Sequence, residues 1–506
     1  MTATVARDEL VFGESEKRPR RWVSPALDWP MPTDRFTSWL WALAVTLFAG
    51  VLRFVGLSHP KGRIFDETYY AVDAHSLLLH AVEKDKNGGP GFVAHPPLGK
   101  WMIAVGEQLF GYNSLGWRFS AAVVGTLMVL VLVRVVRRMF RSTLLGCIAG
   151  LLLSMDGLHF VQSRVALLDI FLAAWILFGF AFLVMDRDQF RRRLANLIAE
   201  GRDLSSGVPR IGFRWYRMAG AACLGAACAV KWSGVWYVFG FLALSWAWDI
   251  GARRSAGVDH PYRDGLLGEW PGVFGGVLLA LVVYVAAWSG WFFTGNGWDR
   301  HWVQDTHRAV GFGPIDAFRN LWHYHAEVWR YHTHLHAWHP YRSRPWTWLI
   351  LGRPVSYHYI SPKHCGAPTC SQEVLALGTP LLWWAFIPAL VFCVWRLLSR
   401  RDWRAQAALV GFAAGFVPWL PFPTRTMFYF YALPFLPFCV IAVTYCLGVI
   451  LGPRDTYPER RATGAILVAG YVAAVALTFA YFYPLYAAKT IPYDDWHARI
   501  WFQTWI

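Results

Sequence analysis

GWRFSAAVVGTLMVLVLVRVV, at residues 116–136, is an apolar run in which only Arg118 and Arg134 carry a charge. A helix of about 20 predominantly apolar residues is long enough to cross the hydrocarbon core of a bilayer. Comparable runs recur from residue 37 to the C-terminal region, and the chain of 506 residues is 56% hydrophobic and only 16% charged. Soluble domains contain about 25% charged residues, so the sequence predicts an all-α, multi-pass integral membrane protein.

Along the whole chain, hydropathy predicts about eleven transmembrane helices. They cover residues 37–57, 116–136, 143–157, 164–185, 215–231, 234–250, 270–293, 377–397, 405–421, 427–450 and 462–484. The chain then divides into an N-terminal tail (1–36), an N-terminal transmembrane catalytic module (37–293), a second external loop (294–376), a C-terminal transmembrane module (377–484) and an external C-terminal tail (485–506). The N-terminal module includes a first external loop at 58–115, and the aromatic content of both loops predicts helices in the membrane interface.

The formal net charge of +16 does not indicate nucleic-acid binding, because the basic residues form short blocks between apolar runs rather than one continuous face. The blocks lie at Lys17–Arg21, Arg134–Arg141, Arg191–Arg193, Arg253–Arg254, Arg396–Arg404 and Arg460–Arg461. By the positive-inside rule they mark the cytoplasmic side. The N-terminus has no apolar signal-peptide core and is predicted to be cytoplasmic. An odd number of spans then places the C-terminus and both long loops outside a plasma membrane.

Two adjacent acidic residues, Asp66 and Glu67, follow the first predicted span and are flanked by Phe65, Tyr69 and Tyr70. A carboxyl group in such a partly desolvated setting has a raised pKa and suits general-base catalysis. The sequence leaves the choice between the two acids open, although the longer side chain of Glu67 favours it as the base. The alternative is structural, because acidic residues also stabilise the first turn of a helix.

Several further ionisable residues are predicted at the outer ends of spans. They are Arg118, Arg164, Asp169, Lys231 and Arg425. Charged residues in or beside spans are costly and are functional candidates by default. Arg164 and Asp169 are close enough in sequence to form a structural pair. The four cations together suit an anionic headgroup, since arginine can offer a bidentate fork to phosphate.

The second external loop contains ten histidines and two cysteines. Several histidines have HxH spacing, which is compatible with metal ligation. The alternative is that these histidines lie among Trp and Tyr side chains at the membrane interface. No HExxH motif is present. Cys365 and Cys370 lie in a segment predicted to be outside, where a disulfide is favoured over half of a metal site. The other six cysteines fall in apolar runs, where a buried thiol is the default.

Several ordered motifs resemble the protein O-mannosyltransferases, in particular the actinobacterial members. These motifs are FDETYYAVDAHSLL, HPPLGKW, GWRFSAAVVG, SRVALLD, AVKWSG, HPYRSRPWTWLILGRPVSY and PTRTMFYFYALPFLPF. The resemblance runs from about residue 36 to residue 485. It implies a type C glycosyltransferase fold and transfer of mannose from a polyprenyl-phosphate-mannose lipid donor to Ser or Thr hydroxyls of exported proteins. The absence of the large folded insertion of eukaryotic members also points to the bacterial branch.

The resemblance assigns Asp66 and Glu67 to the family's acidic pair and Arg118 to an arginine of functional importance. Arg164, Lys231 and Arg425 fall in shared motifs, and their role at the donor phosphate is inferred from charge. Asp169, His95, Lys100 and His339 fall in shared motifs as supporting residues. Some type C relatives bind a divalent metal, so the need for Mg²⁺ or Mn²⁺ stays open. The protein is expected to bind its acceptor proteins at the secretion translocon. Membrane lipid is the other expected partner.

Two other classes of function remain. A type C transferase that modifies a lipid or polysaccharide would share the donor machinery and differ in its acceptor groove. A transporter or flippase of lipid-linked sugar would need polar residues near mid-span and access from both faces. The charged candidates here are predicted to gather on one side, which favours an enzyme.

Overall fold

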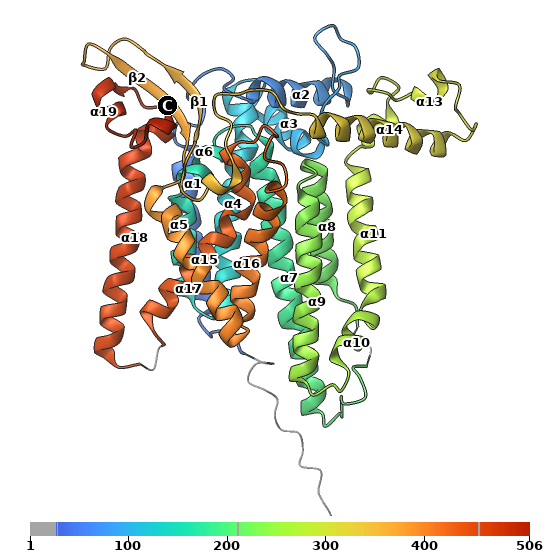
Figure 1. Cartoon of the computed structure of the whole chain (residues 1–506), viewed down its shortest axis with the longest axis vertical. Helices are drawn as coiled ribbons and strands as arrows, with labels where there is room; N and C mark the ends of the chain where they lie inside the picture. The colour runs from blue at the N-terminus through green and yellow to red at the C-terminus, as the bar shows by residue number, and fades with distance from the viewer. Residues whose placement is uncertain (1–26, 28, 210–211, 454–455) are drawn as a thin grey trace, which may run out of the picture.

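A computed structural model describes residues 27, 29–209, 212–453 and 456–506, and most of them are helical (Figure 1). The predicted N-terminal tail and its basic block at Lys17–Arg21 lie outside the described residues, apart from the last part of the tail. The helices form an elongated bundle, with a layer of shorter elements across one end.

Among the described residues, eight helices are long and apolar enough to cross a membrane. They are α1 (Arg35–Phe54), α4 (Ser114–Phe140), α7 (Leu168–Ala199), α9 (Gly234–Ser255), the consecutive α10 (Pro261–Leu267) and α11 (Trp270–Ala286), α15 (Pro380–Arg400), η3 (Tyr429–Phe435) with α17 (Leu436–Leu451), and α18 (Pro458–Tyr486). Each coincides with a predicted span. The multi-pass helical class is therefore confirmed.

The other three predicted spans coincide with shorter helices, α5 (Thr143–Ser154), α8 (Trp215–Val230) and α16 (Trp403–Phe416). They contain 12, 16 and 14 residues, respectively. All three pack against long helices: α5 against α4 and α1, α8 between α7 and α11, and α16 against α9 and α15. The figure of eleven spans stays a prediction, because these three are short for a full crossing.

The ends of α4 illustrate how local sequence sets the helix limits. Asn113 caps its N-terminus, with the side-chain oxygen accepting hydrogen bonds from the backbone N–H groups of Leu115 and Gly116. At the other end Arg141 adopts a left-handed conformation (φ 53°), which stops the helix. Arg137 and Arg138 lie in the last turn, where cations are favoured by the helix dipole.

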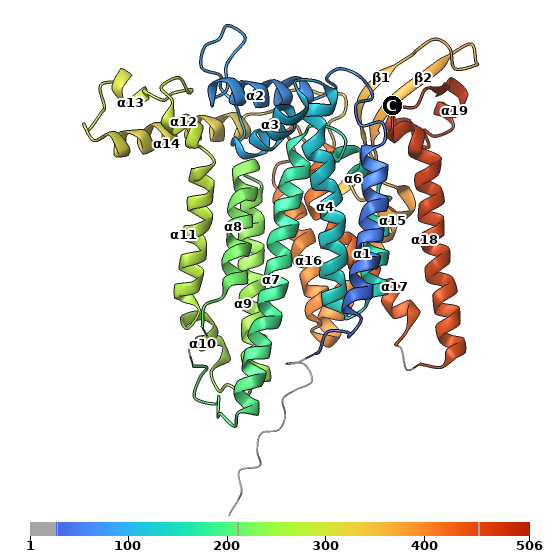
Figure 2. The same ribbon diagram turned by 180° about the vertical axis from the view of Figure 1, so that it is seen from behind.

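The two long loops lie at the same end of the bundle (Figure 2). The first contains α2 (Glu67–His80) and α3 (Leu98–Phe110), and the second contains α13 (Trp302–Asp305), α14 (Gly313–Thr333) and η1 (Pro345–Thr347). The remaining short elements are α6 (Gly157–Gln162), α12 (Ser289–Phe293), η2 (Val417–Trp419), α19 (Tyr493–His497) and η4 (Gln503–Trp505). Helix α14 runs across the bundle direction and exposes Phe318, Trp322 and Trp329, as an interfacial helix would.

A small sheet departs from the all-α expectation. It contains β1 (Val355–Ile360), β2 (Cys370–Ala376) and β3 (Ile491–Pro492), in the order β1–β2–β3 with antiparallel pairing. All residues of β2 are buried, including the polar Ser371, Gln372 and Glu373. A strand of this mixed composition gives no clear hydropathy signal, so it was not predicted. The sheet joins the second external loop to the segment that follows α18.

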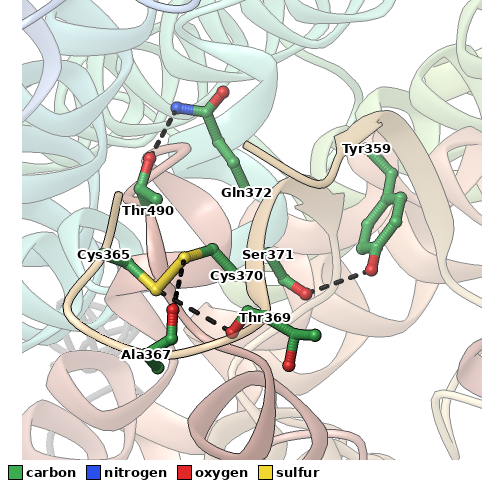
Figure 3. The surroundings of a disulfide bond; sticks show 8 residues. All are labelled: Tyr359, Cys365, Ala367, Thr369, Cys370, Ser371, Gln372 and Thr490. Carbon is green, nitrogen blue, oxygen red and sulfur yellow. Dashed lines mark hydrogen bonds between the residues drawn. A yellow bond between two sulfur atoms is a disulfide. The ribbon is translucent and has the colours of Figure 1, made fainter. Parts of the chain in front are cut away.

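Cys365 and Cys370 form a disulfide across the turn between β1 and β2, as the sequence favoured (Figure 3). Beside it, Tyr359 and Ser371 form a hydrogen bond across the two strands, and Gln372 donates a hydrogen bond to Thr490. The disulfide therefore closes a hairpin that is also fixed by polar contacts from the C-terminal segment.

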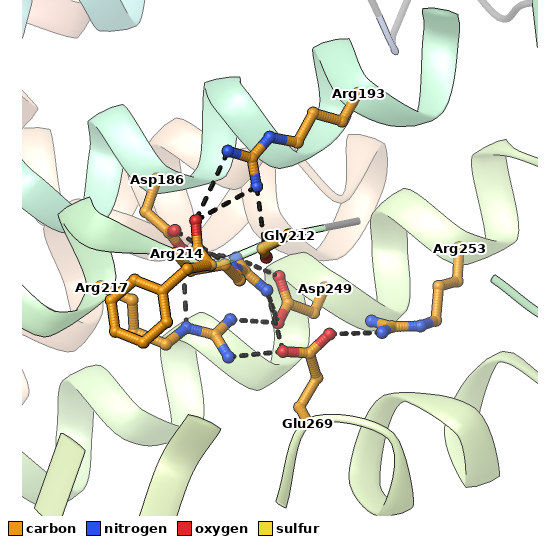
Figure 4. Close-up of polar contacts among 9 residues, drawn as sticks. Asp186, Arg193, Gly212, Arg214, Arg217, Asp249, Arg253 and Glu269 are labelled. Carbon is orange, nitrogen blue, oxygen red and sulfur yellow. Dashed lines mark hydrogen bonds and ion pairs between the residues drawn. The ribbon is translucent and has the colours of Figure 1, made fainter. Parts of the chain in front are cut away.

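At the opposite end of the bundle, a buried ion-pair network joins four segments (Figure 4). Arg214 pairs with Asp186 of α7, Asp249 of α9 and Glu269 before α11, and Arg217 of α8 pairs with the same three acids. Because each charge has several partners of opposite sign, the cost of burying it is offset. The network fixes α7, α8, α9 and α11 to one another.

Candidate active site

Glu67 is the first residue of α2 and is completely buried. Its Oε1 and Oε2 accept hydrogen bonds from Nε and a terminal nitrogen of Arg118, each at 2.7 Å. The same two oxygens also accept from the backbone N–H groups of Ala166 at 3.0 Å and Ile64 at 2.9 Å. All good acceptor positions of this carboxylate are occupied, so it holds segments together instead of facing an open site.

Arg118 is equally buried and does not present its guanidinium to an open phosphate site. Besides Glu67, it donates hydrogen bonds to the backbone carbonyls of Leu57, Pro60 and Gly62. The guanidinium has five N–H donors, and these contacts account for all of them. In this structure Arg118 shapes the loop that carries the acidic pair, and its expected role at the donor phosphate or substrate stays a prediction.

Asp66, in contrast, is half-buried and its carboxylate forms no hydrogen bond or salt bridge with the residues the structure describes. It precedes α2 without capping it, because no side-chain hydrogen bond to the first turn is formed. Burial raises the pKa of Asp66 to about 6; the charge of Asp169 adds to this effect and the charge of Lys231 opposes it. The carboxylate is thus accessible, unpaired and close to the pKa range of a general base.

The backbone just before Asp66 is held in an unusual conformation. Phe65 has a left-handed φ of 47°, which a non-glycine residue adopts at an energetic cost. Its ring stacks on Tyr357 at 4.5 Å, and the Tyr357 hydroxyl accepts a hydrogen bond from Gln162 at 2.6 Å. Aromatic packing therefore fixes the direction in which the neighbouring Asp66 projects.

Lys231 and Asp169 form a buried pair beside Asp66. The Lys231 ammonium donates hydrogen bonds to both carboxylate oxygens of Asp169, at 3.0 and 2.8 Å. Asp169 therefore pairs with Lys231 and not with Arg164, contrary to the alternative raised by their spacing. Two of the three ammonium donors are occupied, which leaves one for another anion.

Arg425 lies at the same site, on the loop before η3, and is partly exposed. Its contacts are long hydrogen bonds: to the backbone oxygen of His332 at 3.3 Å, to that of Thr426 at 3.3 Å, and to Nδ1 of His332 at 3.4 Å. The Tyr431 ring centroid lies 5.9 Å from the Arg425 guanidinium and 5.3 Å from the Lys231 ammonium. Both cations therefore contact the same aromatic side chain, and the charge of Lys231 also acts on Asp66.

His95 contributes a neutral ring to this region. Its ring centroid is 5.3 Å from that of His332 and 6.3 Å from that of Tyr70. Burial lowers the pKa of His95 well below its usual range, and the positive charges of Lys231 and Arg425 add to the effect. A neutral imidazole can donate or accept a hydrogen bond without adding charge.

Arg164 makes its hydrogen bonds with the end of α1, and its expected role at the phosphate stays a prediction. Its guanidinium donates to the backbone oxygens of Arg53 at 2.7 Å, Val55 at 2.7 Å and Gly56 at 2.8 Å. These carbonyls belong to the C-terminal end of α1, where a cation is favoured by the unsatisfied C=O groups. Arg164 is a cap that anchors α1 beneath the acidic loop.

The other two supporting candidates have distinct surroundings. Lys100 of α3 is buried and forms salt bridges with Glu83 and, at 3.8 Å, with Asp73. It therefore links α3 to Asp73 of α2 and to Glu83 in the segment after α2. His339 packs edge-on against Phe428 at 4.9 Å. Phe428 in turn lies 6.3 Å from the Phe65 ring, so His339 belongs to the aromatic support of the acidic loop.

One group of possible metal ligands occurs among the described residues, and it is separate from Asp66. Asp299, His323 and Glu327 offer ligand atoms within 4.8 Å of one another in the second external loop. Nε2 of His323 lies 3.4 Å from Asp299 and 3.9 Å from Glu327, and its ring stacks on Trp302. The structure thus associates one of the ten loop histidines with two carboxylates.

Three residues of the cluster were missed as site candidates in the sequence: Tyr70, His332 and Tyr431. Tyr70 lies one helical turn after Asp66 on α2, and the charge of Asp66 contributes to raising the pKa of Tyr70, after burial as the main cause. Helical spacing of four residues could have identified Tyr70. His332 and Tyr431 come from distant segments, so no local pattern points to them.

Two protein-family models match parts of this chain. Residues 94–199 match the family model described as dolichyl-phosphate-mannose-protein mannosyltransferase, and residues 317–505 match the C-terminal four TMM region of protein-O-mannosyltransferase. A polyprenol-phosphate-mannose–protein mannosyltransferase of Mycolicibacterium smegmatis is 42% identical over 488 residues, covering 94% of each chain. The Mycobacterium tuberculosis protein of the same name is 41% identical, covering 94% of this chain and 93% of its own.

Solved structures show a similar arrangement of helices. The Saccharomyces cerevisiae protein O-mannosyltransferase Pmt1–Pmt2 complex bound to the sugar donor has a TM-score of 0.67 at 15% identity, covering 93% of each chain. ArnT from Cupriavidus metallidurans bound to undecaprenyl phosphate has a TM-score of 0.51 at 17% identity, covering 88% of this chain and 71% of its own. These likenesses confirm the type C glycosyltransferase fold. With relatives above 40% identity along nearly its whole length, this chain belongs to the protein O-mannosyltransferase family.

Proposed function

We propose that this protein transfers mannose from a polyprenyl-phosphate-mannose donor to Ser or Thr hydroxyls of exported proteins, with Asp66 as the general base. The family relation and the names of the mycobacterial relatives support the donor and the class of acceptor. The observation that carries the assignment of the base is the contrast between the two neighbouring acids. Asp66 is unpaired and lies within the electrostatic reach of Lys231, whereas Glu67 is fully occupied by Arg118 and two backbone N–H groups.

This assignment reverses the preference that side-chain length gave to Glu67. A base must accept a proton, and a carboxylate that already accepts four hydrogen bonds in a buried salt bridge has little capacity to do so. Glu67 acts instead as a positioning residue: it fixes the backbone at Ile64 and Ala166 on either side of the loop. The longer side chain therefore serves to reach Arg118.

In the proposed reaction the acceptor Oγ attacks the anomeric carbon of mannose while Asp66 removes the hydroxyl proton. The new O–C bond forms as the bond between the anomeric carbon and the phosphate oxygen breaks, and polyprenyl phosphate leaves with the electron pair. A single displacement inverts the anomeric configuration. The hydroxyl is a weak nucleophile at neutral pH, so removal of its proton is expected to contribute about 10²–10⁴ in rate.

Negative charge grows on the departing phosphate, and Lys231 and Arg425 are the cations proposed to stabilise it. Both flank Tyr431, and each retains N–H donors beyond its contacts within the protein. Preorganised donors in a water-poor site stabilise such charge strongly. This proposal places the active site on the outer face of a plasma membrane, with acceptors arriving from the secretion translocon.

The decisive experiment is transfer by the purified protein from radiolabelled polyprenyl-phosphate-mannose to a Ser/Thr-rich peptide, with cell-envelope lipid as a second acceptor. Label on the peptide supports the proposal, and label confined to the lipid supports a lipid-modifying transferase. Parallel reactions with and without chelator measure the need for Mg²⁺ or Mn²⁺. Asp66→Asn should abolish peptide labelling in every condition, and normal labelling by this variant would contradict the role of Asp66.

A further inference from the structure

A large basic cavity lies at the end of the bundle opposite Asp66, between the ends of α4, α7 and α9 and the junction of α15 with α16. Its volume is about 700 Å³, within the range of ligand-binding pockets. Nine arginines line it, with only two aspartates, Asp188 and Asp402. Neither the mannosyl transfer site nor the ion-pair network of Figure 4 uses this cavity, because none of their residues lines it.

The two aspartates do not balance the arginines. Asp188 already pairs with Arg138, Arg141 and Arg187, at 3.2, 3.0 and 3.0 Å. Asp402 pairs with Arg404 at 2.9 Å and with Arg396 at 3.5 Å. Each acid is therefore shared among several cations, and the cavity keeps a strong excess of positive charge.

Two of the lining arginines also have unused donors in buried positions. The Nε atoms of Arg141 and Arg187 are buried and have no hydrogen-bond partner among the described residues. Arg187 is only 8% exposed, and its guanidinium lies 3.6 Å from the centroid of the Trp403 ring. A buried N–H group without an acceptor costs free energy. Both arginines line the cavity, so their guanidinium groups retain hydrogen-bonding capacity beside it.

The surroundings indicate where that ligand comes from. Trp29 and Trp403 line the cavity beside the arginines, and Trp29 is 49% exposed. Tryptophan is enriched where helices pass the headgroup layer, and basic pockets between helices at that level bind lipid phosphates. Arginines that served only to orient the protein by the positive-inside rule would need neither a cavity nor buried N–H donors without acceptors.

We propose that this arginine cavity binds a phosphate-bearing anion with two or more negative charges, presented by an anionic phospholipid of the leaflet at the basic end of the bundle. The arginine forks match phosphate oxygens in geometry, and a diphosphate headgroup fits a cavity of this size. A soluble phosphate compound has the same chemistry, so both sources must be tested.

The test uses full-length protein in uncharged detergent and measures binding of diphosphatidylglycerol, phosphatidylcholine and inorganic pyrophosphate separately. Arg192→Gln combined with Arg254→Gln removes two exposed lining arginines. The expected loss is about fivefold in affinity per arginine. The matched control is Arg202→Gln with Arg263→Gln, which removes equal charge from exposed arginines that do not line the cavity.

A second variant blocks the cavity without changing its charge. Gly251 lines the cavity, and a Cβ added there meets no atom within 4 Å, so Gly251→Leu should fold and occupy the ligand volume. Loss of diphosphatidylglycerol binding in both test variants, with binding kept in the control, supports the lipid. The same pattern with pyrophosphate alone supports a soluble anion at the same site. Equal loss in the control pair, full affinity in Gly251→Leu, or no preference for either anion over phosphatidylcholine would overturn the proposal.

Discussion

The two adjacent acidic residues of one sequence motif have different hydrogen-bonding surroundings in this protein. Asp66 and Glu67 differ by one methylene and by one position, yet only Glu67 meets Arg118 and two backbone N–H groups. The start of α2 turns the two side chains in different directions, because successive residues of a helix lie about 100° apart around its axis. One carboxylate therefore becomes structural and the other stays free for chemistry.

This difference predicts opposite phenotypes for conservative substitutions. Asp66→Asn should lower kcat by about 10²–10⁴ while the thermal midpoint stays near that of the wild type, because the carboxylate makes no hydrogen bond to lose. Glu67→Gln should instead lower stability by about 3–5 kcal/mol, because it leaves the buried Arg118 charge uncompensated. Thermal unfolding and peptide transfer, measured on both variants, separate the two roles; the reverse pattern would make Glu67 the base.

The raised pKa of Asp66 predicts a pH dependence of transfer. The base must be ionised, and its pKa in the free protein is about 6. The value of kcat/KM should therefore fall about tenfold per pH unit below that value and reach a plateau above it. The check is a pH profile with saturating and limiting peptide, with protein integrity followed by near-UV circular dichroism. A profile that is flat through this range would argue against Asp66 as the titrating group.

Arg425 is the cleaner test of charge stabilisation, since Lys231 also holds Asp169. Arg425→Gln should lower kcat/KM by an amount corresponding to about 1–3 kcal/mol, because a charge-assisted contact to the departing phosphate is lost. Arg319→Gln is the control: it removes a cation from α14 that pairs only weakly with Asp316, at 3.5 Å. Unchanged kinetics in Arg425→Gln would place the phosphate elsewhere.

At the scale of elements, the bundle depends on a few buried charges as well as on apolar packing. Asp249 of α9 accepts hydrogen bonds from both Arg214 and Arg217, and it is 1% exposed. The ion-pair network therefore fixes the positions of these helices along their axes, which contacts between apolar faces alone would not do.

Removal of this one charge should weaken the whole group of helices. Asp249→Asn is expected to lower stability by about 3–5 kcal/mol, because two buried arginines lose a partner. Asp264→Asn is the matched control, as its partner Arg263 is 62% exposed and such surface pairs contribute about 0–1 kcal/mol. Thermal unfolding in detergent measures both variants. Similar midpoints for the two would show that the network adds little to stability.

At the scale of the whole molecule, the acidic pair and the arginine cavity lie at opposite ends of the bundle. The loop with Asp66 and the sheet with its disulfide lie at one end, and the arginine cavity lies at the other. With the positive-inside rule, this separation predicts that Asp66 and Cys370 are external and that Arg138, Arg192 and Arg254 are cytoplasmic.

Accessibility of single introduced cysteines tests this topology. Lys86→Cys should react with a membrane-impermeant maleimide in intact cells, whereas Arg192→Cys should react only after permeabilisation; both positions are exposed in the structure. The unmodified chain is the control for its six free thiols, which lie in the helices. Reaction at position 192 in intact cells would reverse the orientation.

Hydropathy and charge along the chain were enough to predict the helical, multi-pass class, the eight long helices, the two long loops and the acidic pair. The reason is that hydropathy and charge blocks are local properties, which can be read along the chain without knowing which segments meet. The predicted runs coincide with helices from α1 to α18, and the disulfide follows from two nearby cysteines. The all-α expectation failed at the small sheet, because a strand as short and as mixed in polarity as β2 gives no clear hydropathy signal.

The pairing of the polar groups could be seen only in the folded protein. Glu67 accepts hydrogen bonds from Arg118, 51 positions away in the sequence, and from the backbone N–H of Ala166, 99 positions away. The Arg164 guanidinium donates its hydrogen bonds to carbonyls at the end of α1, more than 100 positions away. Which acid is free and which cations remain for phosphate depends on these distant contacts. Each donor and acceptor has a limited number of positions, so their allocation is settled only when the segments pack together.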